Sequence, residues 1–226
     1  MLNQFLYWVS RPVIGLYAQA LLRWQVFRQS PLPEGPKLIV ANHPTTSDPF
    51  FVALAARQPA NILITEKAFQ VPLFGAYLRR LGHIPVIPGQ GRPAFERARQ
   101  ALEAGRTVIM FPEGTLSHED GRLRSPRTGA ARLALLTGAP IIPIGIHLLQ
   151  EKVKLITSII EGETVLIRWP FRGPYTMTIG SALHFNGDVE NWDTVRTVGQ
   201  QVMAHIERLV EQARERMTPI AATGTL

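Results

Sequence analysis

The chain has 226 residues, which is long enough for one α/β domain with a full core and short for two. Hydrophobic residues make up 46% and charged residues 18%, which excludes a disordered chain. The absence of cysteine excludes disulfides, thiolate metal ligands and a cysteine nucleophile. A formal net charge of +7 favours an anionic partner. Because the sequence has no nucleic-acid-binding motif, anionic lipid is a better explanation than nucleic acid.

Residues 1–33 are unusually apolar and rich in aromatic residues. Arg11, Arg23 and Arg28 interrupt them, and no acidic residue precedes Glu34. The segment lacks the basic start and small-residue cleavage site of a signal peptide. Its longest uncharged run, residues 12–22, is too short to span a bilayer, which needs about 20 apolar residues. We predict an apolar helical membrane-association segment that lies among lipid headgroups; the alternative is a helical hairpin packed on the domain.

A proline-rich linker at residues 31–36 separates this segment from a predicted single α/β domain, residues 37–226. Strand-like runs alternate with helical segments in the domain, which predicts a mainly parallel sheet flanked by helices on both faces. The strands are expected at residues 37–41, 61–65, 83–87, 106–111 and 140–146, with two more at 165–167 and 175–179. Helices are expected to begin at Pro49, Val71, Pro93 and Pro126, and an amphipathic helix with apolar positions from Val195 to Ala213 ends the chain.

A histidine and an aspartate follow the first strand of this domain, in the segment Asn42-His43-Pro44-Thr45-Thr46-Ser47-Asp48. A histidine backed by a carboxylate is a general base, because neutral imidazole has a pKa near 6.5. Asp48 would hold the tautomer of the imidazole ring and stabilise its protonated form. The sequence Ser47-Asp48-Pro49 also reads as a helix N-cap, and the two roles are compatible because the carboxylate has two oxygens.

A second polar loop, Phe111-Pro112-Glu113-Gly114-Thr115, follows the apolar run at residues 108–110. Polar loops that leave the ends of two buried strands are the usual geometry of an open α/β active site. Glu113 is therefore expected to project into the same crevice as His43. The alternative is a carboxylate paired structurally with a neighbouring arginine.

These motifs, in this order and spacing, resemble the glycerolipid acyltransferases, a family that includes lysophospholipid and glycerol-3-phosphate acyltransferases. The resemblance covers residues 38–146, about half the chain. It also rests on Lys67 and on the segments at residues 72–75, 81–86, 105–110, 128–130 and 141–144. It implies direct transfer of a fatty acyl chain from acyl-CoA or acyl-carrier protein to a glycerolipid hydroxyl, with His43 and Asp48 catalytic and Glu113, Gly114 and Thr115 binding the acceptor. The best single acceptor is 1-acylglycerol-3-phosphate, which would give phosphatidate.

Two departures from the family pattern concern the acceptor. Leu116 stands where phosphate-handling members commonly have arginine, and Ile87-Pro88 replaces another arginine. Since neither residue can bind phosphate oxygens, Lys67 and Arg127 are the candidates for that role. The alternative is an acceptor without a phosphate monoester, such as a lyso-glycolipid, an aminolipid or a terpenoid alcohol. A non-catalytic lipid-binding protein of the same fold and a hydrolase are further alternatives.

No metal site is predicted, because His118-Glu119-Asp120 reads as a polar turn without a partner at ligand spacing. No cofactor is expected beyond acyl-CoA or acyl-carrier protein as co-substrate. The expected partners are a lysophospholipid acceptor and a membrane surface, with no nucleic acid. The expected location is peripheral or monotopic, at the cytoplasmic face of a membrane.

Overall fold

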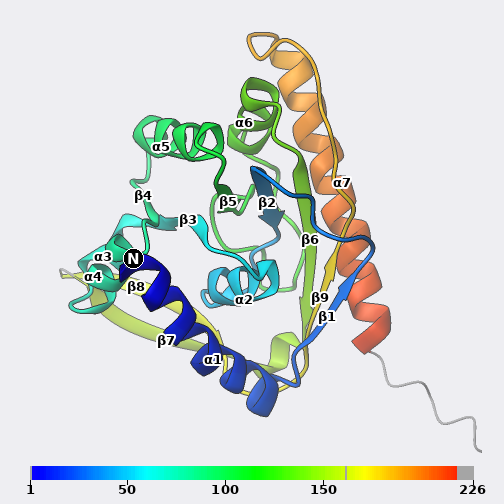
Figure 1. The fold of residues 1–226 in the computed structure, drawn as a ribbon. Helices are drawn as coiled ribbons and strands as arrows, with labels where there is room; N and C mark the ends of the chain where they lie inside the picture. Colours follow the sequence, from blue (N-terminus) through cyan, green and yellow to red (C-terminus); the bar gives the residue numbers. More distant parts are fainter. Residues whose placement is uncertain (1, 161, 218–226) are drawn as a thin grey trace, which may run out of the picture.

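The computed structural model describes residues 2–160 and 162–217, and within these ranges a seven-stranded sheet forms the centre of the fold (Figure 1). Its strand order is β1-β9-β6-β2-β5-β3-β4. The parallel strands are β2 (Lys37–Ala41), β3 (Ala60–Thr65), β4 (Ile84–Val86), β5 (Thr107–Met110) and β6 (Ile141–Leu148). β9 (Tyr175–Ile179) runs antiparallel to β6, and β1 (Gln25–Arg28) pairs parallel with β9 at the edge.

Helices cover both faces of the sheet, as the sequence predicts (Figure 1). α1 (Leu2–Leu22) and α2 (Asp48–Ala56) lie on one face, and α5 (Gly91–Glu103), α6 (Gly129–Thr137) and α7 (Trp192–Met217) lie on the other. In β2, Leu38 and Val40 belong to one core, and Ile39 and Ala41 belong to the other. This alternation follows from the two-residue period of a strand, and it explains why central strands of this sheet read as unbroken apolar runs.

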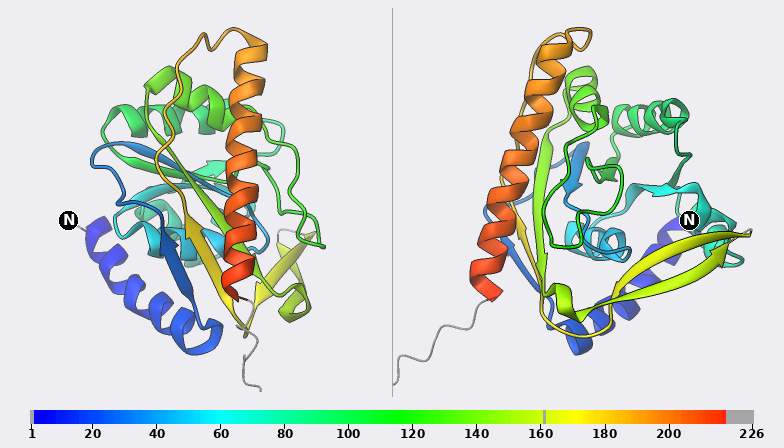
Figure 2. Two further views of the ribbon diagram at one scale, coloured as in Figure 1. Left: turned by 90° about the vertical axis from the view of Figure 1, so that its right-hand side faces the viewer. Right: turned by 180° about the vertical axis from the view of Figure 1, so that it is seen from behind.

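The chain after β6 contains a hairpin that the sequence analysis only partly predicted. Strands β7 (Val153–Ile160) and β8 (Glu163–Pro170) form a two-stranded antiparallel sheet of their own, after the short 3-10 helix η1 (Gln150–Lys152). Figure 2 shows this hairpin reaching away from the main sheet beside α1. The strand predicted at residues 165–167 lies within β8, and β7 was not predicted.

All four predicted helix starts differ from the observed ones, and the start predicted at Pro49 differs by a single residue, since α2 begins at Asp48. The helix predicted from Val71 begins only at Phe74, as α4 (Phe74–Arg80), because Leu73 before it adopts a positive φ of 62°. The short helix α3 (Glu66–Gln70) precedes the predicted range and was not predicted. The helix predicted from Pro93 begins at Gly91. The helix predicted from Pro126 begins only at Gly129, since the Arg127 amide donates instead to the Pro112 carbonyl at 2.8 Å. Residues 126–128 therefore belong to the loop that follows β5.

The N-terminal segment forms one helix, α1, and then the edge strand β1, which was not predicted. α1 leaves several large side chains exposed, among them Trp8, Val13 and Leu16, the last of which is 71% exposed. No helix in the described ranges is long and apolar enough to cross a membrane. The division of the chain at residues 33 and 37, and the membrane association of residues 1–33, stay predictions.

The predicted C-terminal helix is confirmed as α7, whose buried positions include Val195, Val202, Ile206 and Leu209. Its backbone approaches the sheet closely at Gly145 in β6. A Cβ atom placed on Gly145 would lie 2.2 Å from the Leu209 carbonyl carbon and 2.2 Å from the Val210 nitrogen. Because both atoms belong to the helix backbone, no side-chain rotation can relieve the overlap.

Gly145→Ala is therefore expected to lower the free energy of unfolding by about 3 kcal/mol, as α7 is pushed off the sheet. Gly91→Ala is the control, because a Cβ atom there meets nothing within 4 Å. Urea unfolding of both variants measures the difference. Equal stabilities for the two variants would contradict the packing argument.

Candidate active site

The parallel pairing of β2 and β5 brings the two polar loops together. Val40 is paired with Met110, and His43 and Glu113 each lie three residues beyond this pair. Because the strands are parallel neighbours, both loops leave the same edge of the sheet. The His43 amide donates to Glu113 Oε1 at 3.0 Å, so the two predicted site residues are in contact.

His43 and Asp48 form a hydrogen-bonded dyad. His43 Nδ1 lies 2.9 Å from Asp48 Oδ2. Since an ionised carboxylate only accepts hydrogen bonds, the proton is on Nδ1 and Nε2 carries a lone pair. The imidazole stacks on the Phe111 ring with centroids 4.1 Å apart, and 17% of the His43 side chain is exposed. The ring is thus held on two sides and can accept a proton at Nε2.

Asp48 is fully buried, and both of its oxygens accept hydrogen bonds. Oδ2 accepts from the Thr45 amide at 2.7 Å, while Oδ1 accepts from the hydroxyls of Thr45 at 2.5 Å and Tyr175 at 2.6 Å. The predicted N-cap role of Asp48 is wrong. Asp48 is the first residue of α2, whose N-cap is Ser47, and no side-chain cap forms in this described helix. The carboxylate bonds backward to Thr45 instead.

Tyr175 is a site residue that the sequence analysis missed. It lies on β9, is fully buried and donates its hydroxyl hydrogen bond to Asp48. Burial, and then the Asp48 charge, raise the pKa of Tyr175 well above its usual value, so the phenol stays a donor. The sequence carries no local signal for this contact, because the two residues are 127 positions apart.

The Glu113 carboxylate is 3% exposed and binds the protein itself. Oε1 accepts from the His43 amide and from the Ser117 hydroxyl at 2.6 Å, and Oε2 accepts from the Arg124 amide at 2.7 Å. Glu113 thus fixes the loop after β5 against the loop that carries His43. Its acceptor-binding role stays a prediction.

Arg168 of β8, also missed, joins the hairpin to both loops. Its main chain exchanges two hydrogen bonds with Thr46, from the Thr46 amide to the Arg168 carbonyl and from the Arg168 amide to the Thr46 hydroxyl. Its buried guanidinium donates to the Ser117 carbonyl at 2.6 Å. Burial lowers the pKa of Arg168, and the nearby carboxylates of Glu119, Asp48 and Glu113 oppose that shift.

The other predicted site residues differ in how close they lie to the dyad. Gly114 and Thr115 are exposed on the loop after β5, and the Arg127 side chain lies against Gly114, where a Cβ atom would be 2.3 Å from Arg127 Nε. Lys67 instead forms an ion pair with Glu163 at the tip of the hairpin. The structure therefore brings Arg127 next to the predicted acceptor loop and connects Lys67 to β8. In the described ranges, no group of three or more metal-ligating side chains occurs.

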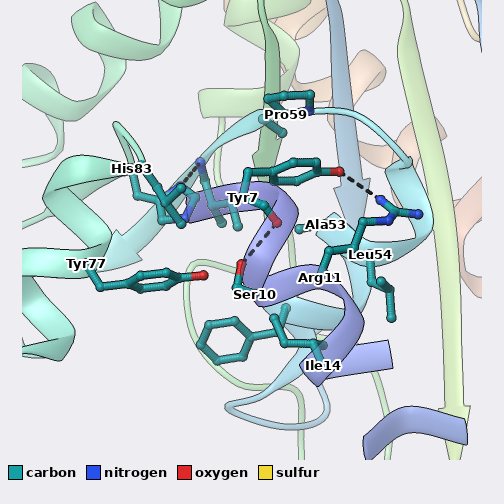
Figure 3. A pocket seen from close by; sticks show the side chains of 13 residues that line it. Tyr7, Ser10, Arg11, Ile14, Ala53, Leu54, Pro59, Tyr77 and His83 are labelled. Atoms are coloured by element: carbon teal, nitrogen blue, oxygen red, sulfur yellow. Dashed lines mark hydrogen bonds between the residues drawn. The ribbon is translucent and has the colours of Figure 1, made fainter. Parts of the chain in front are cut away.

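An apolar cavity of about 90 Å³ lies under α1, between α2, β3 and α4 (Figure 3). Figure 3 shows Tyr77 and His83 at one end and Arg11 and Leu54 at the other. His83 Nδ1 accepts a hydrogen bond from the Ile62 amide at 3.3 Å, and burial lowers the pKa of His83 to about 4. His83 is therefore neutral at physiological pH. It lines this cavity and is not part of the dyad.

The dyad lies at the carboxyl edge of a mostly parallel sheet, and no described residue bonds to His43 Nε2. This defines the class: an α/β protein whose site has the geometry expected of a general base. A profile of the Acyltransferase family matches residues 23–147, more than half of the chain. The chain belongs to this family, which confirms the resemblance found in the sequence.

Individual relatives agree with this assignment. A 1-acyl-sn-glycerol-3-phosphate acyltransferase of Pseudomonas aeruginosa is 27% identical over 82% of this chain and 66% of its own length. The chloroplastic 1-acyl-sn-glycerol-3-phosphate acyltransferase BAT2 of Brassica napus is 28% identical over 61% of this chain and 39% of its own. The chain thus spans about two thirds and two fifths of these relatives.

The fold also matches a solved structure. The crystal structure of the 1-acyl-sn-glycerophosphate acyltransferase PlsC from Thermotoga maritima superposes with a TM-score of 0.65 and 22% identity. The match covers 94% of this chain and 79% of the other. At this identity the likeness establishes the shared α/β fold.

Tyr175→Phe is expected to lower the free energy of unfolding by about 1–2 kcal/mol, because it removes one donor from a buried carboxylate. It should also shift the Nδ1 proton resonance of His43, since Asp48 is then held by fewer bonds. Tyr77→Phe is the matched control, with a hydroxyl that lines the cavity away from the dyad. Urea unfolding and NMR of both variants test this, and an unshifted His43 resonance in Tyr175→Phe would contradict it.

Proposed function

We propose that this protein is a membrane-associated O-acyltransferase that moves a fatty acyl chain from acyl-CoA or acyl-carrier protein to a hydroxyl of a glycerolipid. The observation that carries the proposal is the His43–Asp48 dyad, in which Nδ1 is bonded to a fully buried carboxylate and Nε2 has no partner among residues 2–160 and 162–217. Family membership and the names of the relatives support the same reaction. The best single acceptor is 1-acylglycerol-3-phosphate, giving phosphatidate.

The proposed chemistry is a direct transfer. His43 Nε2 takes the proton of the acceptor hydroxyl as its oxygen attacks the thioester carbonyl carbon. The C–S bond then breaks, an ester forms, and the imidazolium returns the proton to the leaving thiolate. Asp48 stays ionised throughout and stabilises the imidazolium, as carboxylates behind catalytic histidines do. No covalent acyl-enzyme is involved.

Arg127 is the proposed partner of the acceptor phosphate. Its side chain is exposed beside Gly114, at the loop after β5, where it can offer a guanidinium to phosphate oxygens. Lys67 is the second proposed partner, although its ion pair with Glu163 competes for the same charge. If neither residue acts, the acceptor is one of the phosphate-free alternatives, a lyso-glycolipid, an aminolipid or a terpenoid alcohol.

Exposed apolar side chains support the membrane part of the proposal. Trp8, Val13 and Leu16 project from α1, and Leu155 and Ile159 project from β7. Large exposed apolar surfaces of this kind mark sites of protein or membrane contact. Peripheral association through these elements, at the cytoplasmic face of a membrane, would bring the dyad to the acceptor. A non-catalytic lipid-binding role is the alternative, and the intact dyad disfavours it.

Replacing His43 by alanine is expected to slow acyl transfer by about a thousandfold, because the general base is lost. The assay uses labelled acyl-CoA, and then acyl-carrier protein, in detergent–lipid micelles with phosphate-bearing and phosphate-free lyso acceptors. His184→Ala is the control, since this histidine is exposed and remote from the dyad in sequence and contacts. If product forms only with phosphate-free acceptors, the acceptor is not 1-acylglycerol-3-phosphate. Full activity in His43→Ala would sink the enzymatic proposal.

The phosphate role is tested by the KM for lysophosphatidate. Arg127→Gln should raise it about tenfold or more with little change in kcat, because one charge-assisted contact is lost. Lys67→Gln should raise it as well if Lys67 contacts phosphate. Glu163→Gln breaks the same ion pair and keeps the lysine. An unchanged KM in both the Arg127 and Lys67 variants would exclude these residues as phosphate ligands. An equal rise of KM in the Lys67 and Glu163 variants would show that Lys67 acts by holding the β7–β8 hairpin in place.

A further inference from the structure

A second cavity, of about 270 Å³, lies where α1, β1 and the C-terminal end of α2 meet. We call it the arginine cavity, because Arg11, Arg28 and Arg57 line it together with Gly15 and Trp24. Figure 1 shows α1 and β1 diverging from the connection between them, with α2 beside α1. The volume exceeds that of a single water several times, which leaves room for a phosphate group.

Positive charge in this cavity is not balanced by carboxylates from the stretches of chain that line it. The stretches that line it, residues 6–33 and 49–65, contain four arginines and no acidic residue, and three of the four face the cavity. Burial lowers the pKa of Arg28, and the charges of Arg57 and Arg11 lower it further. Such mutual repulsion is relieved when an anion enters.

Hydrogen-bond donors at the cavity wall also remain available. Arg28 donates to the Ala55 carbonyl at 2.6 Å and Arg11 donates to the Tyr7 hydroxyl at 2.8 Å, so each guanidinium has further N–H groups. The Arg57 side chain makes neither a hydrogen bond nor an ion pair within the described residues. The buried indole Nε1 of Trp24 has no partner in the same ranges. The partial negative charge at the carbonyl end of α2 explains why Arg28 lies there, but it does not explain the positions of Arg11 and Arg57.

We propose that the arginine cavity binds the phosphate group of an anionic phospholipid headgroup. Arginine is the side chain best suited to phosphate, because its planar N–H groups match phosphate oxygens. A lipid is the source because α1, which supplies Arg11 and Gly15, also carries the exposed Trp8, Val13 and Leu16. A helix with an apolar face in the bilayer places its basic residues at headgroup level.

This site is separate from the dyad. α2 begins at Asp48 and ends at Ala56, next to Arg57, so its two ends are about 13 Å apart. Lipid binding here orients the protein on the bilayer and takes no part in proton transfer. The inference therefore stands or falls independently of the acyl-transfer reaction.

Two variants test the cavity in different ways. Arg57→Asn removes one charge, and asparagine tolerates the left-handed φ of 56° at this position. Gly15→Met keeps every charge and fills the space, since a Cβ atom at Gly15 meets only Leu54, at 4.0 Å. Arg97→Gln, on the exposed side of α5 across the sheet, is the control for net charge.

The measurement is sedimentation of the full chain with vesicles of phosphatidylcholine, alone or with one quarter phosphatidylglycerol, at a fixed salt concentration. We expect phosphatidylglycerol to strengthen binding, and both cavity variants to weaken that binding about tenfold while Arg97→Gln leaves it unchanged. Acyl transfer in detergent micelles should be the same in all four proteins, which also verifies folding.

Other outcomes overturn the proposal. Equal loss in Arg97→Gln would show attraction by net charge alone. Unaltered binding in Gly15→Met would place the headgroup outside the cavity. Calorimetry with inorganic phosphate and glycerol 3-phosphate separates the two sources of phosphate. Tight, saturable binding of these soluble ions, lost in both cavity variants and without a preference for anionic vesicles, would replace the lipid by a free phosphate compound.

Discussion

The buried carboxylate of Asp48 is the interaction on which the rest of the site depends. A fully buried charge is tolerated only when it is compensated by hydrogen bonds, and its two oxygens accept from Thr45, Tyr175 and His43. Those donors come from the loop after β2 and from β9, on the other side of β6. The carboxylate therefore fixes the loop conformation, the imidazole orientation and the position of an antiparallel strand at once. A dyad built in this way has little freedom to reorganise, which suits a general base.

Glu113 has the same function for the second loop. Its oxygens accept hydrogen bonds from the main-chain amides of His43 and Arg124 and from the Ser117 hydroxyl, so residues 113–124 are held against the loop that carries His43. Arg168 then secures this arrangement from outside the main sheet, through Thr46 and the Ser117 carbonyl. The hairpin is thus part of the site, although it does not pair with the main sheet. β8 carries both Glu163, which pairs with Lys67, and Arg168, which bonds to the loop that carries His43.

Sequence patterns predicted the part of this arrangement that depends on local order. β-Branched runs predicted the central strands to within a few residues, and parallel alternation placed the loops after β2 and β5 at one edge, so His43, Asp48 and Glu113 were expected together. Tyr175 and Arg168 could not be predicted, because Tyr175 meets Asp48 and Arg168 meets Thr46 across more than a hundred residues, through tertiary contacts that have no local signature. The edge strand β1 was not predicted, because its four residues have the same apolar and basic composition as the N-terminal segment that precedes them.

Helix α2 runs from the dyad to the arginine cavity. Its first residue is the dyad carboxylate, and its last turn holds Arg28 through the Ala55 carbonyl beside Arg57. A helix is rigid over nine residues, so an anion bound at the arginine cavity fixes the distance and direction from that anion to His43. For the proposed enzyme, whose acceptor would reside in a bilayer, orientation would determine whether the acceptor hydroxyl can reach Nε2. In the proposed function, the arginine cavity would hold the protein at the lipid surface while the dyad acts on a hydroxyl group of a lipid in that surface.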